Sequence, residues 1–149
     1  MHGEIEGRSG QPFTMVVELG KIREFARATK SRNPAYDGGP GDAPVSPGTF
    51  LITQVFWQTP ASDPFAGIER DLERTLHGEQ RFEFIGPPPK AGDVLTCSSR
   101  IARIYEKVGR RGGTMRFADM VTEFRDRRGH LVATSTIVTI ETSKPTSES

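Results

Sequence analysis

Cysteine is nearly absent from this sequence, which has only Cys97 among its 149 residues. A single cysteine cannot form an internal disulfide, and it leaves no CxxC or Cys/His spacing for a structural zinc site. Stability must therefore come from an ordinary apolar core, for which one domain of this length is sufficient. We expect Cys97 to be a small buried strand residue, and we expect no metal and no other cofactor.

The sequence also lacks an excess of one charge and any long apolar run. Twenty lysines and arginines face 19 acidic residues, so the basic excess with which proteins bind nucleic acid or anionic lipid is missing. No apolar run reaches the roughly 18 residues that span a bilayer, and the polar, charged N-terminus does not look like a secretion signal. These features predict a cytoplasmic protein that binds neither nucleic acid nor membranes.

The two ends of the chain contain few apolar side chains whose burial could offset the loss of conformational entropy on ordering. Residues 1–12 and the final SKPTSES, residues 143–149, are rich in small and polar side chains. We therefore predict a flexible N-terminal segment over 1–12, one folded domain over 13–142 and a flexible tail over 143–149.

The first half of the folded region predicts one strand and two helices. Alternation over 13–18 is typical of a short strand, and the apolar spacing of three and four over 19–29 predicts an amphipathic helix that ends before Pro34. A loop rich in glycine and proline follows over 35–48. Residues 50–57, FLITQVFW, are apolar on almost every side, so we expect this helix to be wrapped by other elements.

The second half predicts an antiparallel sheet. Four segments with strand composition, separated by the turn sequences GPPPKAG, GRRG and DRRG, cover residues 76–85, 93–107, 113–127 and 130–142. Consecutive strands with short turns indicate an antiparallel meander. The element order predicts the α+β class, with a curled antiparallel sheet wrapped around a central apolar helix.

Two stretches suggest a family. FARATKSRNPAYDG (residues 25–38), followed by Ala43, Pro44, Thr49 and Phe50, resembles the region around the active site of MaoC-like hydratases and dehydratases. LHGEQRFEFIGPPPKAGDVLTCSSRI is similar to the amino-terminal type of MaoC-like domain. This resemblance implies a single hot-dog fold.

The resemblance also indicates what this chain lacks. Active members of the family carry Asp-x-Asn-Pro-x-His, in which the aspartate activates water and the histidine exchanges the second proton beside the thioester. Asn33 and Pro34 match, but Ser31 occupies the aspartate position and Tyr36 the histidine position. Serine and tyrosine hold their protons too tightly to act as general bases near neutral pH without a further activating group. The chain therefore looks like the half of a double hot-dog enzyme that lacks the Asp/His pair and helps to accept the acyl tail.

Candidate site residues follow from the resemblance and from residue chemistry. The candidates for binding an acyl thioester are Asn33, Tyr36, Thr49, Phe50, Val55 and Trp57. His77 is a weak candidate base, and Arg110 and Arg111 could bind the phosphates of coenzyme A or of an acyl carrier protein, because guanidinium groups suit phosphate geometry. Structural roles remain as alternatives: a helix stop for Asn33-Pro34, ring packing for Tyr36, and core packing for residues 50–57.

Three functional hypotheses remain open. The first is an acyl-thioester-binding subunit of a (3R)-hydroxyacyl dehydratase or enoyl hydratase, working beside a catalytic hot-dog partner that carries the Asp/His pair. The second is a homodimeric hot-dog thioesterase, against which residues 50–57 contain no carboxylate. The third is a non-enzymatic acyl-CoA-binding module. In each case we expect a homodimer or a heterodimer, since a single hot-dog sheet leaves unpaired edges.

Overall fold

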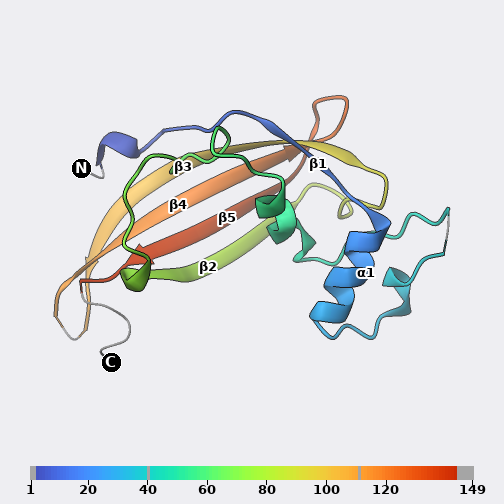
Figure 1. Cartoon of the computed structure of the whole chain (residues 1–149), viewed down its shortest axis with the longest axis horizontal. Coiled ribbons are helices and arrows are strands. Elements are labelled where there is room, and N and C mark those ends of the chain that lie inside the picture. Colours follow the sequence, from blue (N-terminus) through green and yellow to red (C-terminus); the bar gives the residue numbers. More distant parts are fainter. Residues whose placement is uncertain (1–2, 40, 111, 144–149) are drawn as a thin grey trace.

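One curled antiparallel sheet is the main feature of the computed structural model, which describes residues 3–39, 41–110 and 112–143 (Figure 1). Its strands are β1 (Phe13–Val16), β2 (Thr75–Phe84), β3 (Val94–Val108), β4 (Thr114–Arg125) and β5 (Leu131–Glu141). They are arranged in the order β1-β3-β4-β5-β2, and all neighbours are antiparallel. The α+β class and the curled sheet are as predicted.

The position of β2 differs from the predicted meander. Strands β3, β4 and β5 do follow one another, but β2 pairs with β5 at the far edge of the sheet and not with β3. The connection from β2 to β3 forms no tight turn, because its backbone bonds elsewhere: Ser46 N donates to Pro89 O at 2.7 Å, and Gly92 N donates to Val17 O at 2.8 Å. Three consecutive prolines also remove backbone donors from this connection.

The predicted helices are present, although the second has a different form. Helix α1 (Leu19–Ala28) ends before Pro34 as expected and buries Ile22 and Ala26. Residues 50–56 form η3 (Phe50–Phe56), a 3₁₀ helix. Short 3₁₀ turns complete the set: η1 (Gly3–Ile5), η2 (Pro34–Tyr36) and η4 (Leu72–Arg74).

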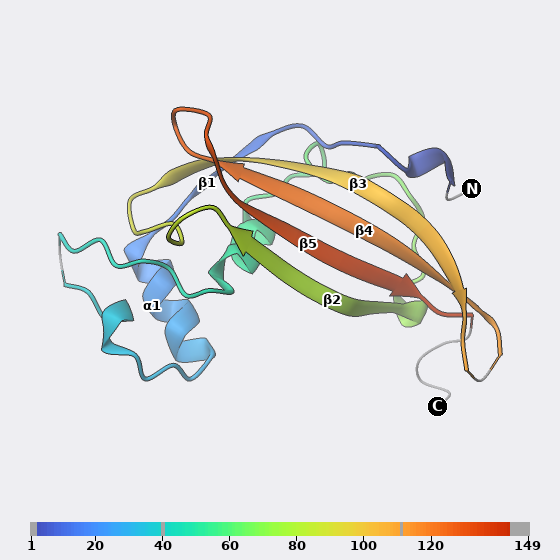
Figure 2. The same cartoon turned by 180° about the vertical axis from the view of Figure 1, so that it is seen from behind.

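The expectation that residues 50–57 are wrapped on every side is wrong. A 3₁₀ helix repeats every three residues, so Leu51 and Gln54 share one buried face. On the other side Val55 is 45% exposed and Phe56 is 79% exposed. Figures 1 and 2 show that η3 and the connection from it to β2 lie on one face of the sheet, whereas the opposite face is bare.

The N-terminal segment, whose flexibility over 1–12 stays a prediction, is hydrogen-bonded to the sheet. Gly7 N donates to Ile101 O at 2.8 Å, Gly10 N donates to Ser99 O at 3.0 Å, and the carboxylate of Glu6 accepts from Ile104 N at 2.8 Å. These bonds hold the segment that precedes the short strand β1 along β3 (Figure 1). The composition of the segment did not predict this attachment, because backbone hydrogen bonding does not depend on side-chain hydrophobicity. Most of the predicted tail, residues 144–149, lies outside the described residues.

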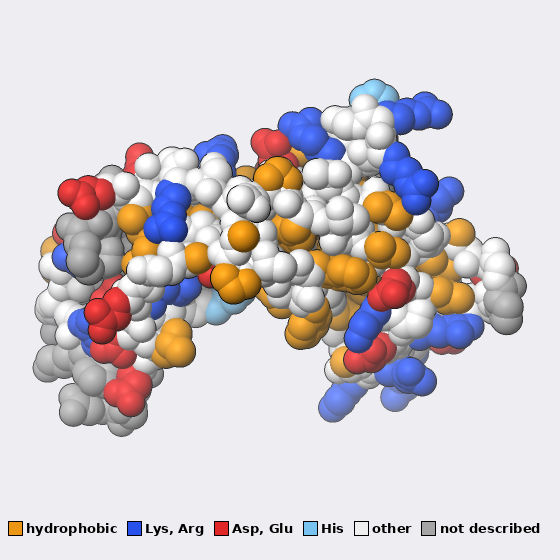
Figure 3. Space-filling view, turned by 45° about the horizontal axis from the view of Figure 1, so that its top comes forward, with side chains coloured by type: hydrophobic (Ala, Val, Ile, Leu, Met, Phe, Trp, Pro, Cys, Tyr) orange, Lys and Arg blue, Asp and Glu red, His pale blue; other side chains and the backbone are white. Residues whose placement is uncertain are grey.

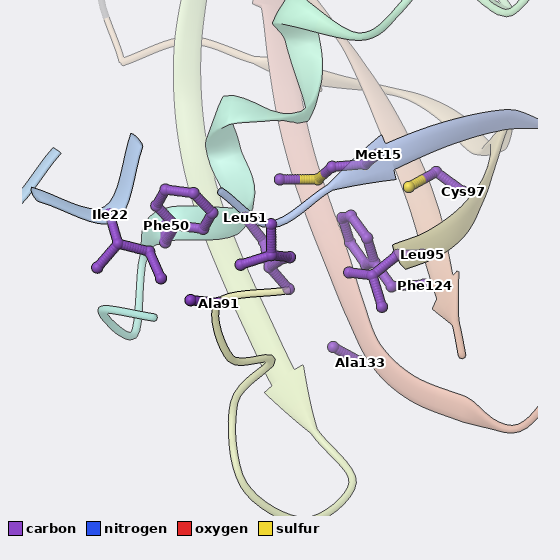
Figure 4. Packing of buried hydrophobic residues seen from close by; sticks show 10 residues of the cluster. Met15, Ile22, Phe50, Leu51, Ala91, Leu95, Cys97, Phe124 and Ala133 are labelled. Atoms are coloured by element: carbon purple, nitrogen blue, oxygen red, sulfur yellow. The ribbon is translucent and has the colours of Figure 1, made fainter. Parts of the chain in front are cut away.

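The core lies between η3, α1 and one end of the sheet (Figure 4). Leu51 from η3 lies between Phe50 and the sheet residues Leu95 and Phe124 in this view, and Ile22 lies on the side of α1. Cys97 is fully buried in this cluster, as predicted, and burial raises the pKa of its thiol to about 12. The thiol therefore stays protonated and unreactive near neutral pH.

Phe124 is the largest sheet residue of this core, which makes Phe124→Ala a direct test of the packing. The substitution should lower the free energy of unfolding by about 3–5 kcal/mol, because a fully buried ring is lost and a cavity remains. Val108→Ala, at a position that is 80% exposed, should change it by less than about 0.5 kcal/mol. Urea denaturation measures both values, and a loss below about 1 kcal/mol for Phe124→Ala would contradict this core.

Candidate functional site

The segment after α1 holds the Ser31, Asn33 and Tyr36 positions. The Oδ1 atom of Asn33 accepts from Ala35 N at 3.0 Å and caps η2, and the Ser31 hydroxyl accepts from Asn33 N at 3.3 Å. Both side chains are exposed. The capping role of Asn33-Pro34 is therefore present, while a role of Asn33 in ligand binding stays a prediction.

Arg23 of α1 holds this segment in place. Its guanidinium donates to the carbonyl of Asp37 at 2.9 Å and also to the carbonyl of Gly38. Tyr36, just before these carbonyls, is half-buried and packs against the core cluster to which Phe50 belongs. The structure thus brings Tyr36 and Phe50 to the same cluster, which shows the ring packing of Tyr36, while its role in ligand binding stays a prediction.

A groove runs between α1 and η3. It is lined by Val16, Glu18, Lys21, Phe50, Thr53, Phe56 and Trp57. Phe50 lines it and also packs edge-to-face against Phe25, with ring centroids 5.6 Å apart. Of the predicted binding residues on this segment, Phe50 and Trp57 line the groove, but Thr49 and Val55 do not.

Thr53 is a groove residue that the sequence did not single out. Its hydroxyl oxygen is buried and has no hydrogen-bond partner among the described residues. A buried hydroxyl without a partner is costly, so Thr53 is a polar position beside the groove that the packing leaves unsatisfied. The only signal in the sequence was a polar residue inside the run FLITQVF, and many buried helices contain one.

His77 and Arg110 lie far from this groove. His77 is exposed near the start of β2, whereas η3 and α1 lie beside the opposite end of that strand (Figure 1). Arg110 is exposed in the turn between β3 and β4, again at the end of the sheet away from α1. Arg111 lies outside the described residues. The fold therefore does not bring His77 or Arg110 to the Tyr36 segment.

The described ranges, 3–39, 41–110 and 112–143, hold neither a cluster of metal ligands nor a membrane-spanning helix. No three histidine, cysteine, aspartate or glutamate side chains gather there in a way that would hold a metal ion. None of the helices in these ranges has both the length and the apolar character needed to cross a membrane.

Comparison with known proteins places this fold. The sequence model of the FAS1-like dehydratase domain region matches residues 5–135. A UPF0336 protein of Streptomyces coelicolor is 35% identical over 140 residues, 87% of each chain, and a UPF0336 protein of Streptomyces griseus is 33% identical over 135 residues, 83% of this chain and 84% of that one.

Solved structures with a similar fold include dehydratases. A chain of the HadBC (3R-hydroxyacyl-ACP dehydratase) complex from Mycobacterium tuberculosis is 27% identical, with a TM-score of 0.71 over 91% of this chain and 96% of that one. A MaoC-like dehydratase is 25% identical, with a TM-score of 0.69 over 92% of this chain and 43% of that one. The ChsH1-ChsH2 complex from the same Mycobacterium, at 18% identity and a TM-score of 0.69 over 97% of this chain and 95% of that one, shows the same fold. The protein therefore belongs to the FAS1-like dehydratase domain family and is a hydratase/dehydratase-like member of the MaoC group with the hot-dog fold.

Proposed function

We propose that this chain is the acyl-thioester-binding subunit of a (3R)-hydroxyacyl-thioester dehydratase or enoyl-thioester hydratase, and that a partner hot-dog subunit supplies the Asp/His pair. One observation carries this proposal: a chain of the dehydratase family has Ser31 and Tyr36 where the family pattern has its acid and base. Ser31 is an exposed loop residue whose hydroxyl accepts from Asn33 N, and Tyr36 packs on the core. Within the described residues, neither hydroxyl is hydrogen-bonded to a carboxylate or imidazole that would activate it.

The groove between α1 and η3 supports the acyl-binding part of the proposal. Its lining is mainly apolar, and it starts at the buried face of Phe50, close to the cluster that contains Tyr36. The tail of a thioester would lie against Phe50, Phe56 and Trp57. The 79% exposure of Phe56 is unusual for a large apolar side chain, and a bound acyl chain or a partner subunit would cover it.

The free edge of the sheet supports the partner part of the proposal. At the other edge β1 and the N-terminal segment already cover β3, so β2 is the long strand with an unpaired side. Ile85 N donates to Val132 O at 2.9 Å. By the alternation of antiparallel pairing, Phe84, Phe82 and Gln80 direct their backbone groups away from β5. The relative from Mycobacterium tuberculosis named HadBC was likewise solved as a complex.

Substitution of Gln80 tests whether β2 is the association edge. Gln80→Pro removes an outward N–H group and should weaken association at least about tenfold, because a strand added at this edge loses a hydrogen bond and meets the proline ring. Gln80→Ala is the matched control: it removes the side-chain bond to Ser135 but keeps the N–H group, so association should be nearly unchanged. Sedimentation equilibrium measures the effect. A strict monomer at high micromolar concentration that also fails to bind a catalytic hot-dog partner would contradict the proposal.

The experiment that tests the function is an assay of crotonyl-CoA hydration by this chain alone and by the chain mixed with a hot-dog protein that carries Asp-x-Asn-Pro-x-His. A neighbouring gene that encodes such a protein is the natural source of the partner.

A further inference from the structure

A second groove lies between two turns at the end of the sheet near α1. One wall is the connection between β2 and β3, and the other is the turn between β4 and β5. The residues that matter here are Val45, Ile85, Pro88, Lys90, Arg127 and Arg128, all of which line it. Figure 3 shows lysine and arginine side chains gathered at this end of the molecule, beside exposed hydrophobic ones.

The floor of this groove is apolar and open. Ile85 is 60% exposed and Val45 is 40% exposed, and Pro88 and Val132 are half-buried. Single exposed apolar side chains are common on protein surfaces, but a contiguous apolar patch inside a groove is typical of a binding site. The floor therefore suits a ligand segment with methyl and methylene groups.

The rim of the groove is cationic. Lys90, Arg127 and Arg128 are exposed, and no side-chain hydrogen bond or ion pair engages them within the described part of the chain. Two carboxylates also line the groove, but backbone groups already bind them. Asp93 accepts from Lys90 N at 2.9 Å, and Asp126 accepts from Arg128 N at 2.8 Å and from His130 N at 3.0 Å.

The state of Asp126 matters for the charge of the rim. Hydrogen bonds from the backbone N–H groups, that of His130 first, lower the pKa of Asp126, so it remains ionised and bound to its own turn. The imidazole of His130 lies 3.5 Å from the same carboxylate. Arg128 also interacts electrostatically with this carboxylate, but within the described residues Lys90, Arg127 and Arg128 have no side-chain hydrogen bond or close ion pair. Three cations along one rim suit a ligand with more than one negative charge.

This groove is lined at one side by the end of the loop that carries the Tyr36 position. Val45 forms an isolated bridge with Lys90, and Ala91 N donates to Pro44 O at 3.0 Å. Residues 44–46 end the loop that begins with Asn33 and Tyr36. A ligand in the groove would therefore lie along the same loop that carries the Tyr36 position.

We propose that this groove binds the phosphopantetheine end of the acyl thioester, with the phosphate at Lys90, Arg127 and Arg128 and the pantetheine arm over Val45 and Ile85. This inference rests on the proposed function and adds a binding site for the phosphopantetheine group of the substrate. It differs from the phosphate site at Arg110 and Arg111 that the sequence suggested, since Arg110 lies at the opposite end of the sheet. The planar guanidinium groups match phosphate oxygens in pairs, which lysine alone does not.

The test compares thioesters with and without phosphate. Calorimetry would measure the Kd of octanoyl-CoA and of octanoyl-pantetheine for the native chain, for Arg127→Ala/Arg128→Ala and for the matched control Arg110→Ala. The double substitution should raise the Kd of octanoyl-CoA at least about tenfold, because charge-assisted bonds to phosphate are lost. It should leave the Kd of octanoyl-pantetheine within about twofold, and the Arg110→Ala control should change neither value. An octanoyl carrier protein, measured in parallel, shows which source of phosphopantetheine the groove prefers.

Each result decides the inference. Equal binding of octanoyl-CoA by the native and doubly substituted chains, or an equal loss for both thioesters, rejects the groove while the proposed function stands. If the native chain binds none of the three thioesters, the proposed function fails and the groove inference fails with it. A selective loss for octanoyl-CoA or for the octanoyl carrier protein supports the groove.

Discussion

The purified chain alone is expected to hydrate crotonyl-CoA at least 100-fold more slowly than the same chain mixed with a hot-dog partner that carries Asp-x-Asn-Pro-x-His. Addition of water requires a base beside the β-carbon and a proton donor at the α-carbon, and a positioned acid or base typically contributes a factor of roughly 10² to 10⁴ in rate. Ser31 and Tyr36 supply neither. Loss of the enoyl absorbance measures the rate.

Two variants test whether Tyr36 or His77 is responsible for any activity that the chain shows without a partner. Tyr36→Phe removes the hydroxyl at the histidine position, and His77→Ala removes a histidine that lies near the start of β2. Neither should change the rate of the chain alone. A turnover of several per second from this chain without a partner, abolished by either substitution, would disprove the argument from the missing Asp/His pair.

The elements that were predicted well have local causes. The spacing of Ile22 and Ala26 defines the buried face of α1, and Pro34 limits its extent. The alternation along β3, β4 and β5 and the glycines of their turns place those strands within one or two residues of the observed bounds. These patterns are contained in neighbouring residues, so they can be interpreted without knowledge of the fold.

The features that were missed depend on pairing between distant residues. Nothing in the composition of β2 indicates that it pairs with β5 and not with β3. The attachment of Gly7 and Gly10 to β3 uses backbone atoms, which every sequence has. The run FLITQVFW shows that η3 is apolar, but it does not show which side faces the sheet and which stays open.

In the candidate site, too, some residues could be identified from local sequence and others only from the fold. Tyr36 and Phe50 were identified from short motifs, and they do reach one cluster. Lys90 and the pair Arg127-Arg128 belong to turns almost 40 residues apart, so only the fold reveals that they line a common groove. Arg110 attracted attention because of its turn sequence, yet that turn lies at the other end of the sheet.

Blocking the groove between α1 and η3 should abolish tight binding of long acyl chains. Thr53→Trp places a large ring in the groove, whereas Val55→Trp, on the same 3₁₀ helix but outside the groove, is the matched control. Each methylene removed from water is worth roughly 0.8 kcal/mol, so exclusion of four of them costs about 3 kcal/mol, a loss of affinity of more than about a hundredfold.

Comparison of a long and a short acyl chain distinguishes this effect from a general loss of folding or of thioester binding. Calorimetry with dodecanoyl-CoA and with acetyl-CoA, after urea denaturation has confirmed that both variants fold, should show the loss for dodecanoyl-CoA only, because acetyl-CoA has no tail to exclude. Val55→Trp should change the Kd of dodecanoyl-CoA by less than about threefold, since the added ring extends from a side chain that is already 45% exposed. If Thr53→Trp binds dodecanoyl-CoA as tightly as the native chain, the acyl tail does not use this groove, and the apolar side of η3 serves only packing against the core and the partner subunit.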